Sequence, residues 1–136
     1  MEETASENPP SFLHLQEIVA TLRGERGCPW DIRQTPETMT RYLLEECEEL
    51  VEAITQKDED SICEETGDVL FILAFLISIY TERNQFTASN VFSRIIEKMI
   101  RRHPHVFAGQ QIPDEQALRE QWQRIKLQEK RSTKTP

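Results

Sequence analysis

Residues 61–83 constrain the fold most strongly, because they contain the longest apolar run of the chain. The run extends from Val69 to Ile79 and is broken only by Ser78. It falls well short of the roughly 20 residues that a helix needs to cross a bilayer, so it predicts a buried core helix. At helical spacing, two acids lie on the face that should point inward. That face carries Ile62, Glu65, Asp68, Val69, Ile72, Leu76 and Ile79.

Helix signals occur on both sides of this stretch, and no segment alternates as a β-strand would. The clearest start is Thr35-Pro36-Glu37, with a capping hydroxyl, a proline at the first helical position and an acid against the helix dipole. Residues 24–35 have no period and predict a loop, long enough to suggest a function. The sequence therefore predicts an all-α fold, a bundle of about four to five helices. The expected helices cover residues 11–23, 35–56, 61–83, 87–103 and 113–131.

The length of 136 residues suits one domain. We place it at residues 11–131, between a flexible arm at 1–10 and a frayed tail at 132–136. The formal net charge of −8 argues against nucleic acid as a partner, because polyanion binding depends largely on Lys and Arg. The first residues lack the basic start and apolar stretch of a secretory signal, and three cysteines, an odd number, favour reduced thiols. We therefore expect a cytoplasmic protein with no membrane contact.

The helix expected at 35–56 also carries acids beside an apolar stripe. The stripe is formed by Leu43, Cys47, Leu50, Val51 and Ile54. Glu46 lies on its flank, and Glu49 follows one turn further along the same side. The remaining acids of this region point more nearly outward, as in a solvated face: Glu45, Glu48 and Glu52. Two acidic pairs, Glu46 with Glu49 and Glu65 with Asp68, should therefore lie on neighbouring antiparallel helices.

Ionised carboxylates cannot be buried without partners, because the cost of removing their charge from water is prohibitive. Protonation, salt bridges or a divalent cation would each neutralise them. Four carboxylates favour the cation and suit Mg²⁺, with Mn²⁺ as a possible substitute. Ferritin-like iron sites use Glu-x-x-His units, and none occurs here. We therefore predict that Glu46, Glu49, Glu65 and Asp68 are metal ligands. Gly67 beside them indicates either a close approach of backbone or ligand, or tolerated helix packing.

The acidic segments at 44–49 (Leu-Glu-Glu-Cys-Glu-Glu) and 65–68 (Glu-Thr-Gly-Asp) resemble the E-E-x-x-E … E-x-x-D signature of MazG-type nucleoside triphosphate pyrophosphohydrolases. Three further stretches look similar to that family: residues 27–35, the Arg-Arg-His-Pro-His-Val-Phe run at 101–107, and Trp122 with Lys126, Glu129 and Lys130. Together they cover about residues 13–130. Members of that family often carry two such domains in tandem, whereas we expect a single one here.

The resemblance implies an all-α fold, a homodimer or larger homo-oligomer, and Mg²⁺-dependent cleavage of a nucleoside triphosphate to monophosphate and pyrophosphate. Such an enzyme would serve house-cleaning or control of the nucleotide pool. With the four ligands in place, Glu45 is the best remaining carboxylate for orienting water. The resemblance points to phosphate contacts at Arg101, Arg102, Lys126 and Lys130. Base or sugar contacts are expected at Trp30, Asp31 and Gln34.

Several alternatives stay open at this point. Arg101 and Arg102 would also interact favourably with a helix C-terminus, and Trp30 would equally serve as a buried anchor of its loop. The His103 and His105 pair would suit zinc only with a second pair of ligands at recognisable spacing, which is missing. The alternative function is a non-catalytic helical dimer that senses a nucleotide or binds a protein, with the acids as a structural metal site.

Overall fold

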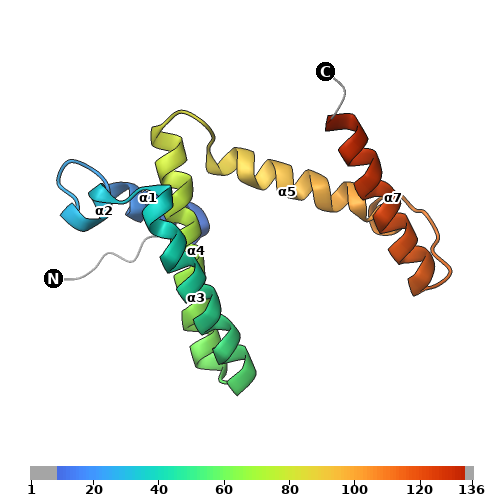
Figure 1. Ribbon diagram of the computed structural model, residues 1–136, viewed down its shortest axis with the longest axis horizontal. Helices are drawn as coiled ribbons and strands as arrows, with labels where there is room; N and C mark the ends of the chain where they lie inside the picture. The colour runs from blue at the N-terminus through green and yellow to red at the C-terminus, as the bar shows by residue number, and fades with distance from the viewer. Residues whose placement is uncertain (1–8, 134–136) are drawn as a thin grey trace. The chain divides into compact units, whose positions relative to one another are not determined.

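The computed structural model describes residues 9–133, which form two compact helical units, one ending at Thr87 and one beginning at Ala88. The first unit contains α1 (Phe12–Leu22), α2 (Pro29–Arg33), α3 (Pro36–Gln56) and α4 (Glu59–Glu82) (Figure 1). The second contains α5 (Ala88–Arg102), α6 (Pro104–Phe107) and α7 (Glu115–Thr133). Within the described range no strand is present, which confirms the predicted all-α class. Residues 1–8 of the expected arm and 134–136 of the expected tail lie outside the described residues, whereas α7 continues through residues 132 and 133, which were expected to belong to the tail.

Helix ends follow the local capping chemistry. The Thr35 hydroxyl accepts a hydrogen bond from the Thr38 amide, and the Thr38 hydroxyl accepts one from the Thr35 amide, which closes a capping box at the start of α3. Helix α4 begins two residues before the expected start at Ser61, because the Asp58 carboxylate caps it by accepting from the Ser61 amide. Five long helices therefore lie close to their predicted positions.

The prediction that residues 24–35 are a structureless loop was wrong in part. Residues Pro29–Arg33 form the short helix α2, which has its proline at the first helical position. A second short helix, α6, follows the expected break before Pro104. Neither helix has enough turns to produce a detectable apolar period, so the periodicity analysis could not find them.

The core of the first unit confirms the buried helix predicted at 61–83. Helix α4 packs against both α3 and α1. It contributes four of the six residues of the central cluster, which consists of Val19, Met39, Ile72, Ala74, Phe75 and Ile79. Burying a side chain such as Phe75 stabilises the fold by roughly 1.5–3 kcal/mol. The acidic N-terminal half of α4 is therefore continuous with an apolar half that is firmly packed in the core.

The stripe predicted on the second helix is only partly buried. Leu43 and Leu50 are half-buried, but Val51 and Ile54 are 61% and 54% exposed. Helix α3 packs mainly on one neighbour, α4, and a single contact covers less of its circumference than the stripe occupies.

Arg23 fastens the segment around α2 to the hairpin of α3 and α4. Its guanidinium donates to both carboxylate oxygens of Glu82 at 2.9 Å. It also donates to the backbone carbonyl oxygens of Asp31 and Gln34. These bonds connect α2 and its C-cap residue Gln34 to the end of α4.

The second unit is held together by contacts from α7 to α5 and α6. Glu129 of α7 accepts hydrogen bonds from both Arg101 and Arg102 of α5. The Trp122 ring lies against the Arg102 guanidinium, with 5.2 Å between the guanidinium carbon and the ring centroid. None of the described helices has the length and apolar character needed to span a membrane.

Candidate metal centre

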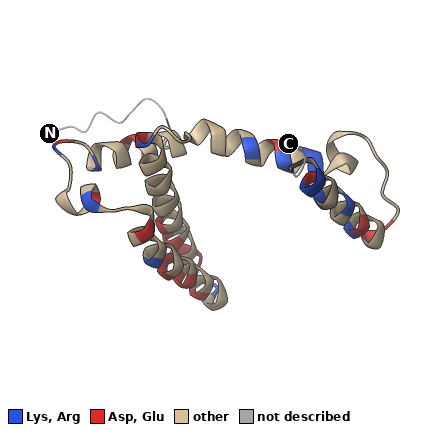
Figure 2. Ribbon diagram, turned by 45° about the horizontal axis from the view of Figure 1, so that its top comes forward, with Lys and Arg blue, Asp and Glu red and all other residues tan. Residues whose placement is uncertain are grey.

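The turn at Lys57 and Asp58 folds α3 and α4 into an antiparallel pair, which brings the two acidic segments together. One carboxylate oxygen from each of four side chains lies within 4.8 Å of the other three. The four are Glu46 and Glu49 of α3 with Glu65 and Asp68 of α4. Figure 2 shows acidic residues gathered along this hairpin. The structure therefore brings together all four predicted ligands.

Two of these carboxyl groups carry an oxygen that is shielded from water and has no hydrogen-bond partner, Oε2 of Glu46 and Oε2 of Glu65. Burial raises the pKa of Glu46 above its ordinary value, and the neighbouring carboxylates of Glu49 and Asp68 raise it further. Burial likewise raises the pKa of Glu65 to about 7, with added contributions from Glu49 and Asp68. The cluster is therefore electrostatically unfavourable when all four groups are ionised.

Of the three ways to neutralise the cluster, the described residues exclude salt bridges. The ion pairs among residues 9–133 involve none of the four acids. Protonation or a cation remains, and the donor set contains only carboxylate oxygens, which suits a hard divalent ion. The two unpartnered oxygens fit such an ion, because a cation would supply the interaction that they lack.

Glu45 and Gly67 each adjoin a member of the cluster in the sequence, but both have open surroundings. Glu45 is exposed and lies 3.8 Å from the Nε atom of Arg41, in an ion pair one turn apart on α3. Gly67 has no atom within 4 Å of the position that a Cβ would take. Among the described residues, Gly67 therefore marks no close approach of another backbone segment.

The predicted base or sugar contacts divide into two groups. Trp30 and Gln34 line a cavity of about 410 Å³ beside α3, and the Gln34 side-chain amide donates to the Trp30 carbonyl oxygen. Trp30 is 40% exposed and its ring packs edge-on against Tyr42, with 5.5 Å between the centroids. Asp31 is buried and does not line that cavity. Trp30 is thus a partly exposed wall of a cavity rather than a fully buried anchor.

The predicted phosphate contacts lie in the second unit. Arg101 and Arg102 share the carboxylate of Glu129, and the hydrogen bond from Arg102 is the main cause that lowers the pKa of Glu129 to about 2. Lys126 is half-buried and Lys130 is exposed on α7. The sequence analysis noted Glu129 as part of a motif but missed this pairing. No local signal pointed to it, because Glu129 lies 27 and 28 residues from the two arginines in the sequence.

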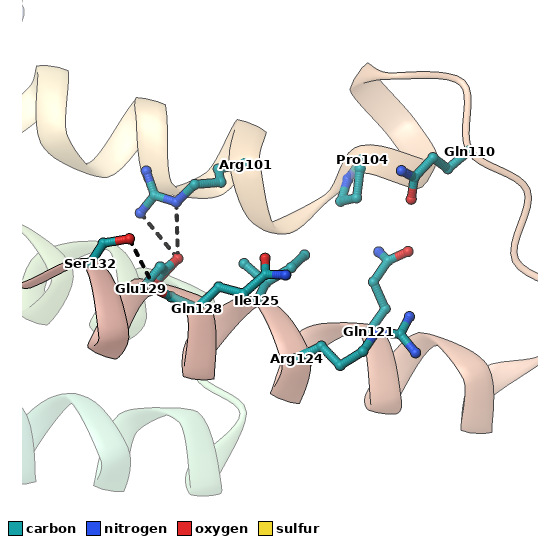
Figure 3. A pocket seen from close by; sticks show the side chains of 9 residues that line it. All are labelled: Arg101, Pro104, Gln110, Gln121, Arg124, Ile125, Gln128, Glu129 and Ser132. Atoms are coloured by element: carbon teal, nitrogen blue, oxygen red, sulfur yellow. Dashed lines mark hydrogen bonds and ion pairs between the residues drawn. The ribbon is translucent and has the colours of Figure 1, made fainter.

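Arg101 also lines a cavity of about 650 Å³ between α7 and the α5–α6 region (Figure 3). Figure 3 shows the Gln121 amide pointing from α7 toward Pro104 and Gln110. His105 interacts through Nδ1 with the Gln121 side-chain amide, and His103 through Nδ1 with the backbone carbonyl of Met99. Both histidines are thus engaged in holding α6 in place.

The fold and the site define a class: an all-α protein in which two neighbouring helices present four convergent carboxylates. Residues 34–107 match the family described as the MazG nucleotide pyrophosphohydrolase domain. The chain belongs to this family. The matched residues include all four acids of the cluster, and Trp30, Asp31, Lys126 and Lys130 lie outside them.

Curated relatives support the same assignment. Over 124 residues the chain is 45% identical to the nucleoside triphosphate pyrophosphohydrolase/pyrophosphatase MazG of Thermotoga maritima, covering 91% of this chain and 47% of that protein. It is 41% identical to YabN of Bacillus subtilis, covering 91% of this chain and 25% of that protein. It is 38% identical over 114 residues to the nucleoside triphosphate pyrophosphohydrolase of Escherichia coli K12, covering 83% and 43%. The chain thus spans a quarter to about half the length of these relatives.

The fold is shared with a solved structure, the crystal structure of a mazG-related protein from Thermotoga maritima. The superposition has a TM-score of 0.69 at 28% sequence identity and covers 84% of this chain and 97% of that chain. This likeness confirms the predicted MazG-like helical fold.

Proposed function

We propose that this chain is a Mg²⁺-dependent nucleoside triphosphate pyrophosphohydrolase, which cleaves the bond between the α and β phosphates. The products would be a nucleoside monophosphate and pyrophosphate. The observation that carries the proposal is the cluster of four carboxylates, two of which have a buried oxygen without a partner. Relatives that are 38–45% identical are named for this activity, which supports the same reaction class.

In this proposal Glu46, Glu49, Glu65 and Asp68 hold the metal. Mg²⁺, or Mn²⁺ in its place, would neutralise phosphate oxygens and lower the pKa of a bound water. Glu45 is exposed next to this cluster, and we assign it the role of orienting the attacking water and accepting its proton. Its ion pair with Arg41 is long and solvated, so little energy opposes its release.

The cationic residues of the second unit are proposed phosphate contacts. One carboxylate, Glu129, neutralises only one of the two guanidinium charges of Arg101 and Arg102. A net positive charge therefore remains there, and Lys126 and Lys130 of α7 add to it. Together these residues would attract the triphosphate to a protein whose net charge is −8.

The cellular role that we propose is house-cleaning or control of the nucleotide pool in the cytoplasm. We also propose a homodimer or larger homo-oligomer, because Val51, Ile54, Leu70 and Leu73 leave apolar surface exposed on α3 and α4. Size-exclusion chromatography with light scattering measures this assembly. A strictly monomeric protein at assay concentrations would contradict it.

The activity is tested by incubating pure protein with a mixture of nucleoside triphosphates and Mg²⁺ and measuring pyrophosphate. We expect Glu49→Gln and Asp68→Asn to abolish pyrophosphate release. The matched control is Glu48→Gln, which removes an exposed acid from the same turn of α3 and should retain full activity. Calorimetric titration with Mg²⁺ separates the alternatives. Bound metal without pyrophosphate release would favour the non-catalytic nucleotide-sensing or protein-binding dimer, and full activity in both cluster variants would refute the ligand assignment.

A further inference from the structure

The cavity of about 650 Å³ in the second unit has a volume typical of small-molecule sites, which range over about 300–1,000 Å³. Residues of α7 form one of its walls, and the end of α5, the start of α6 and the loop before α7 form the other (Figure 3). Among the described residues that line it, Arg101 alone is a proposed contact of the triphosphate. The proposed hydrolysis therefore leaves most of this cavity without a role.

Helix geometry separates the cavity from the two lysines of α7 that are proposed phosphate contacts. At about 100° per residue, the lining residues Gln121, Ile125 and Gln128 lie within about 60° of one another around the helix axis. Lys126 and Lys130 lie about 130° and about 170° from the middle of that stripe. A ligand in the cavity would therefore contact the face of α7 that points away from the two lysines.

Three polar side chains of the cavity wall are available to a ligand. Arg124 and Gln128 come from α7, and Gln110 comes from the loop before it. Within residues 9–133 these three side chains form no hydrogen bond and no ion pair. All three are exposed, so a ligand can bind them without breaking a contact that holds the fold together.

Gln121 provides a polar group whose position is already fixed. Its side chain is buried, at 4% exposure, and its Nε2 atom lies 3.2 Å from Nδ1 of His105. Figure 3 shows its amide pointing from α7 toward Pro104 and Gln110. Because this amide is ordered before a ligand arrives, a hydrogen bond to it costs little side-chain entropy. The cavity thus combines one preorganised amide with three adaptable polar side chains.

The charges around the cavity suit a phosphate group. Arg101 and Arg102 share the carboxylate of Glu129, so one positive charge is left in excess. Arg124 adds a second positive charge. A phosphate monoester carries a charge of about −1.5 to −2 at neutral pH, and guanidinium groups bind phosphate oxygens through paired hydrogen bonds. Ile125 is half-buried and offers apolar contact to the rest of such a ligand.

We propose that this cavity is a second ligand site, which binds a small phosphate monoester. The phosphate lies between the guanidinium groups of Arg101 and Arg124. The amides of Gln121 and Gln128 contact the organic part, which lies over Ile125. Arg101 belongs both to this site and to the proposed triphosphate contacts, so the decisive variants are those of Arg124 and Gln128. Binding at this site involves no turnover and does not depend on the proposed hydrolysis.

Isothermal titration calorimetry of the full chain with ribose 5-phosphate, without added metal, tests the proposal. We expect Arg124→Gln to raise Kd about tenfold, as for the loss of a hydrogen bond to a charged group. Gln128→Ala should raise Kd about threefold, as for the loss of one neutral hydrogen bond. Inorganic phosphate should bind about tenfold more weakly than ribose 5-phosphate, because it lacks the organic part that the two amides contact. An unchanged Tm shows that each variant folds as the wild type does.

The matched control is Arg119→Gln, which removes the same charge from α7. Arg119 is 78% exposed and lies about 150° around the helix from the cavity stripe, so its Kd should stay within about twofold of the wild-type value. Equal losses in Arg119→Gln and Arg124→Gln would overturn the site, because binding would then depend only on net charge. A loss in Lys130→Gln without one in Arg124→Gln would also overturn it, because the phosphate would then lie at the proposed triphosphate contacts.

Two results with the wild-type chain would overturn the site as well. Equal affinities for ribose 5-phosphate and inorganic phosphate would show that the organic part makes no contact. No measurable binding of ribose 5-phosphate would show that the cavity does not take a phosphate monoester. A wild-type protein that hydrolyses no nucleoside triphosphate would contradict the proposed function, whereas these titrations would still decide whether the second site exists.

Discussion

Replacing Arg23 by alanine should release the segment around α2 from the rest of the first unit. The Arg23 side chain is 8% exposed and makes two hydrogen bonds to Glu82 at 2.9 Å. One terminal nitrogen, Nη1, also donates to the carbonyl oxygens of Asp31 at 2.6 Å and Gln34 at 3.1 Å. The guanidinium lies 5.1 Å from the centroid of the Phe75 ring. Alanine would remove all of these contacts at once.

The loss of stability in Arg23→Ala depends on whether water can replace the arginine at each group that it binds. The Glu82 side chain is 46% exposed, so its carboxylate regains hydration, and losing that ion pair costs at most about 1 kcal/mol. The two backbone carbonyls are part-buried, and each bond to a charged donor contributes about 1.5–3 kcal/mol. Allowing for partial rehydration, we expect Arg23→Ala to lower the free energy of unfolding by about 3 kcal/mol. For a unit of this size that corresponds to a decrease in Tm of about 12–24 °C.

Thermal unfolding followed by circular dichroism measures the difference, with two companion variants. Glu82→Gln removes the ion pair but keeps both carbonyl bonds, and it should cost about 1 kcal/mol or less. Arg23→Lys keeps the charge but cannot donate to both carbonyls and to Glu82 together, so it should fall between the other two. Equal losses for Arg23→Ala and Glu82→Gln would refute the reasoning, because the carbonyl bonds would then contribute nothing.

Three further predictions concern pH and the glycines. In metal-free protein the pKa of Glu65 is raised to about 7, so the folded state holds this proton more tightly than the unfolded chain does. Tm should therefore fall as the pH rises from about 4.5 to about 7. Mg²⁺ should abolish this fall, and a steady rise of Tm without metal would contradict the prediction. The pKa of Glu129 is lowered to about 2, so its ionised carboxylate stabilises the folded state at higher pH. Glu129→Gln should therefore be less stable than the wild type above about pH 4.5 but not near pH 2. Urea unfolding at both pH values measures this, and equal losses of stability at both would contradict the prediction. Gly27→Ala should be strongly destabilising, because its Cβ would overlap the backbone carbonyl of Leu22. Gly67→Ala should instead raise the free energy of unfolding by up to about 1 kcal/mol, because its Cβ meets no other atom. Urea unfolding of both variants measures the difference, and similar values for the two would refute the reasoning.

The sequence was informative wherever the decisive signal was local and repeated. Glu65 and Asp68 stand within the apolar stripe of α4, and the helix period alone placed them on the face toward α3. The helix start at Thr35-Pro36 was equally predictable, because the capping hydroxyl and the proline both act within one turn. By contrast, α2 consists of five residues, too few to show a period.

Contacts between distant residues could not be predicted in the same way. Arg23 ends α1 in the sequence and offers no sign that it binds Glu82, 59 residues away. The pairing of Arg101 and Arg102 with Glu129 is likewise set by how α7 folds back on α5. A helix period defines the face on which a side chain lies, but it does not define which residue lies opposite that face.

The division of α4 into an acidic half and an apolar half accounts for how the cluster can exist in a folded chain. Four carboxylates within 4.8 Å of one another oppose folding until they bind a proton or a cation. The residues that follow along the same helix, Ile72, Phe75 and Ile79, are buried in the core and supply opposing stabilisation. The apolar half therefore holds α4 in place, so the position of the acids does not depend on salt bridges that they form themselves. In the proposed function, a cluster preformed in this way would lower the cost of ordering its ligands when a cation binds.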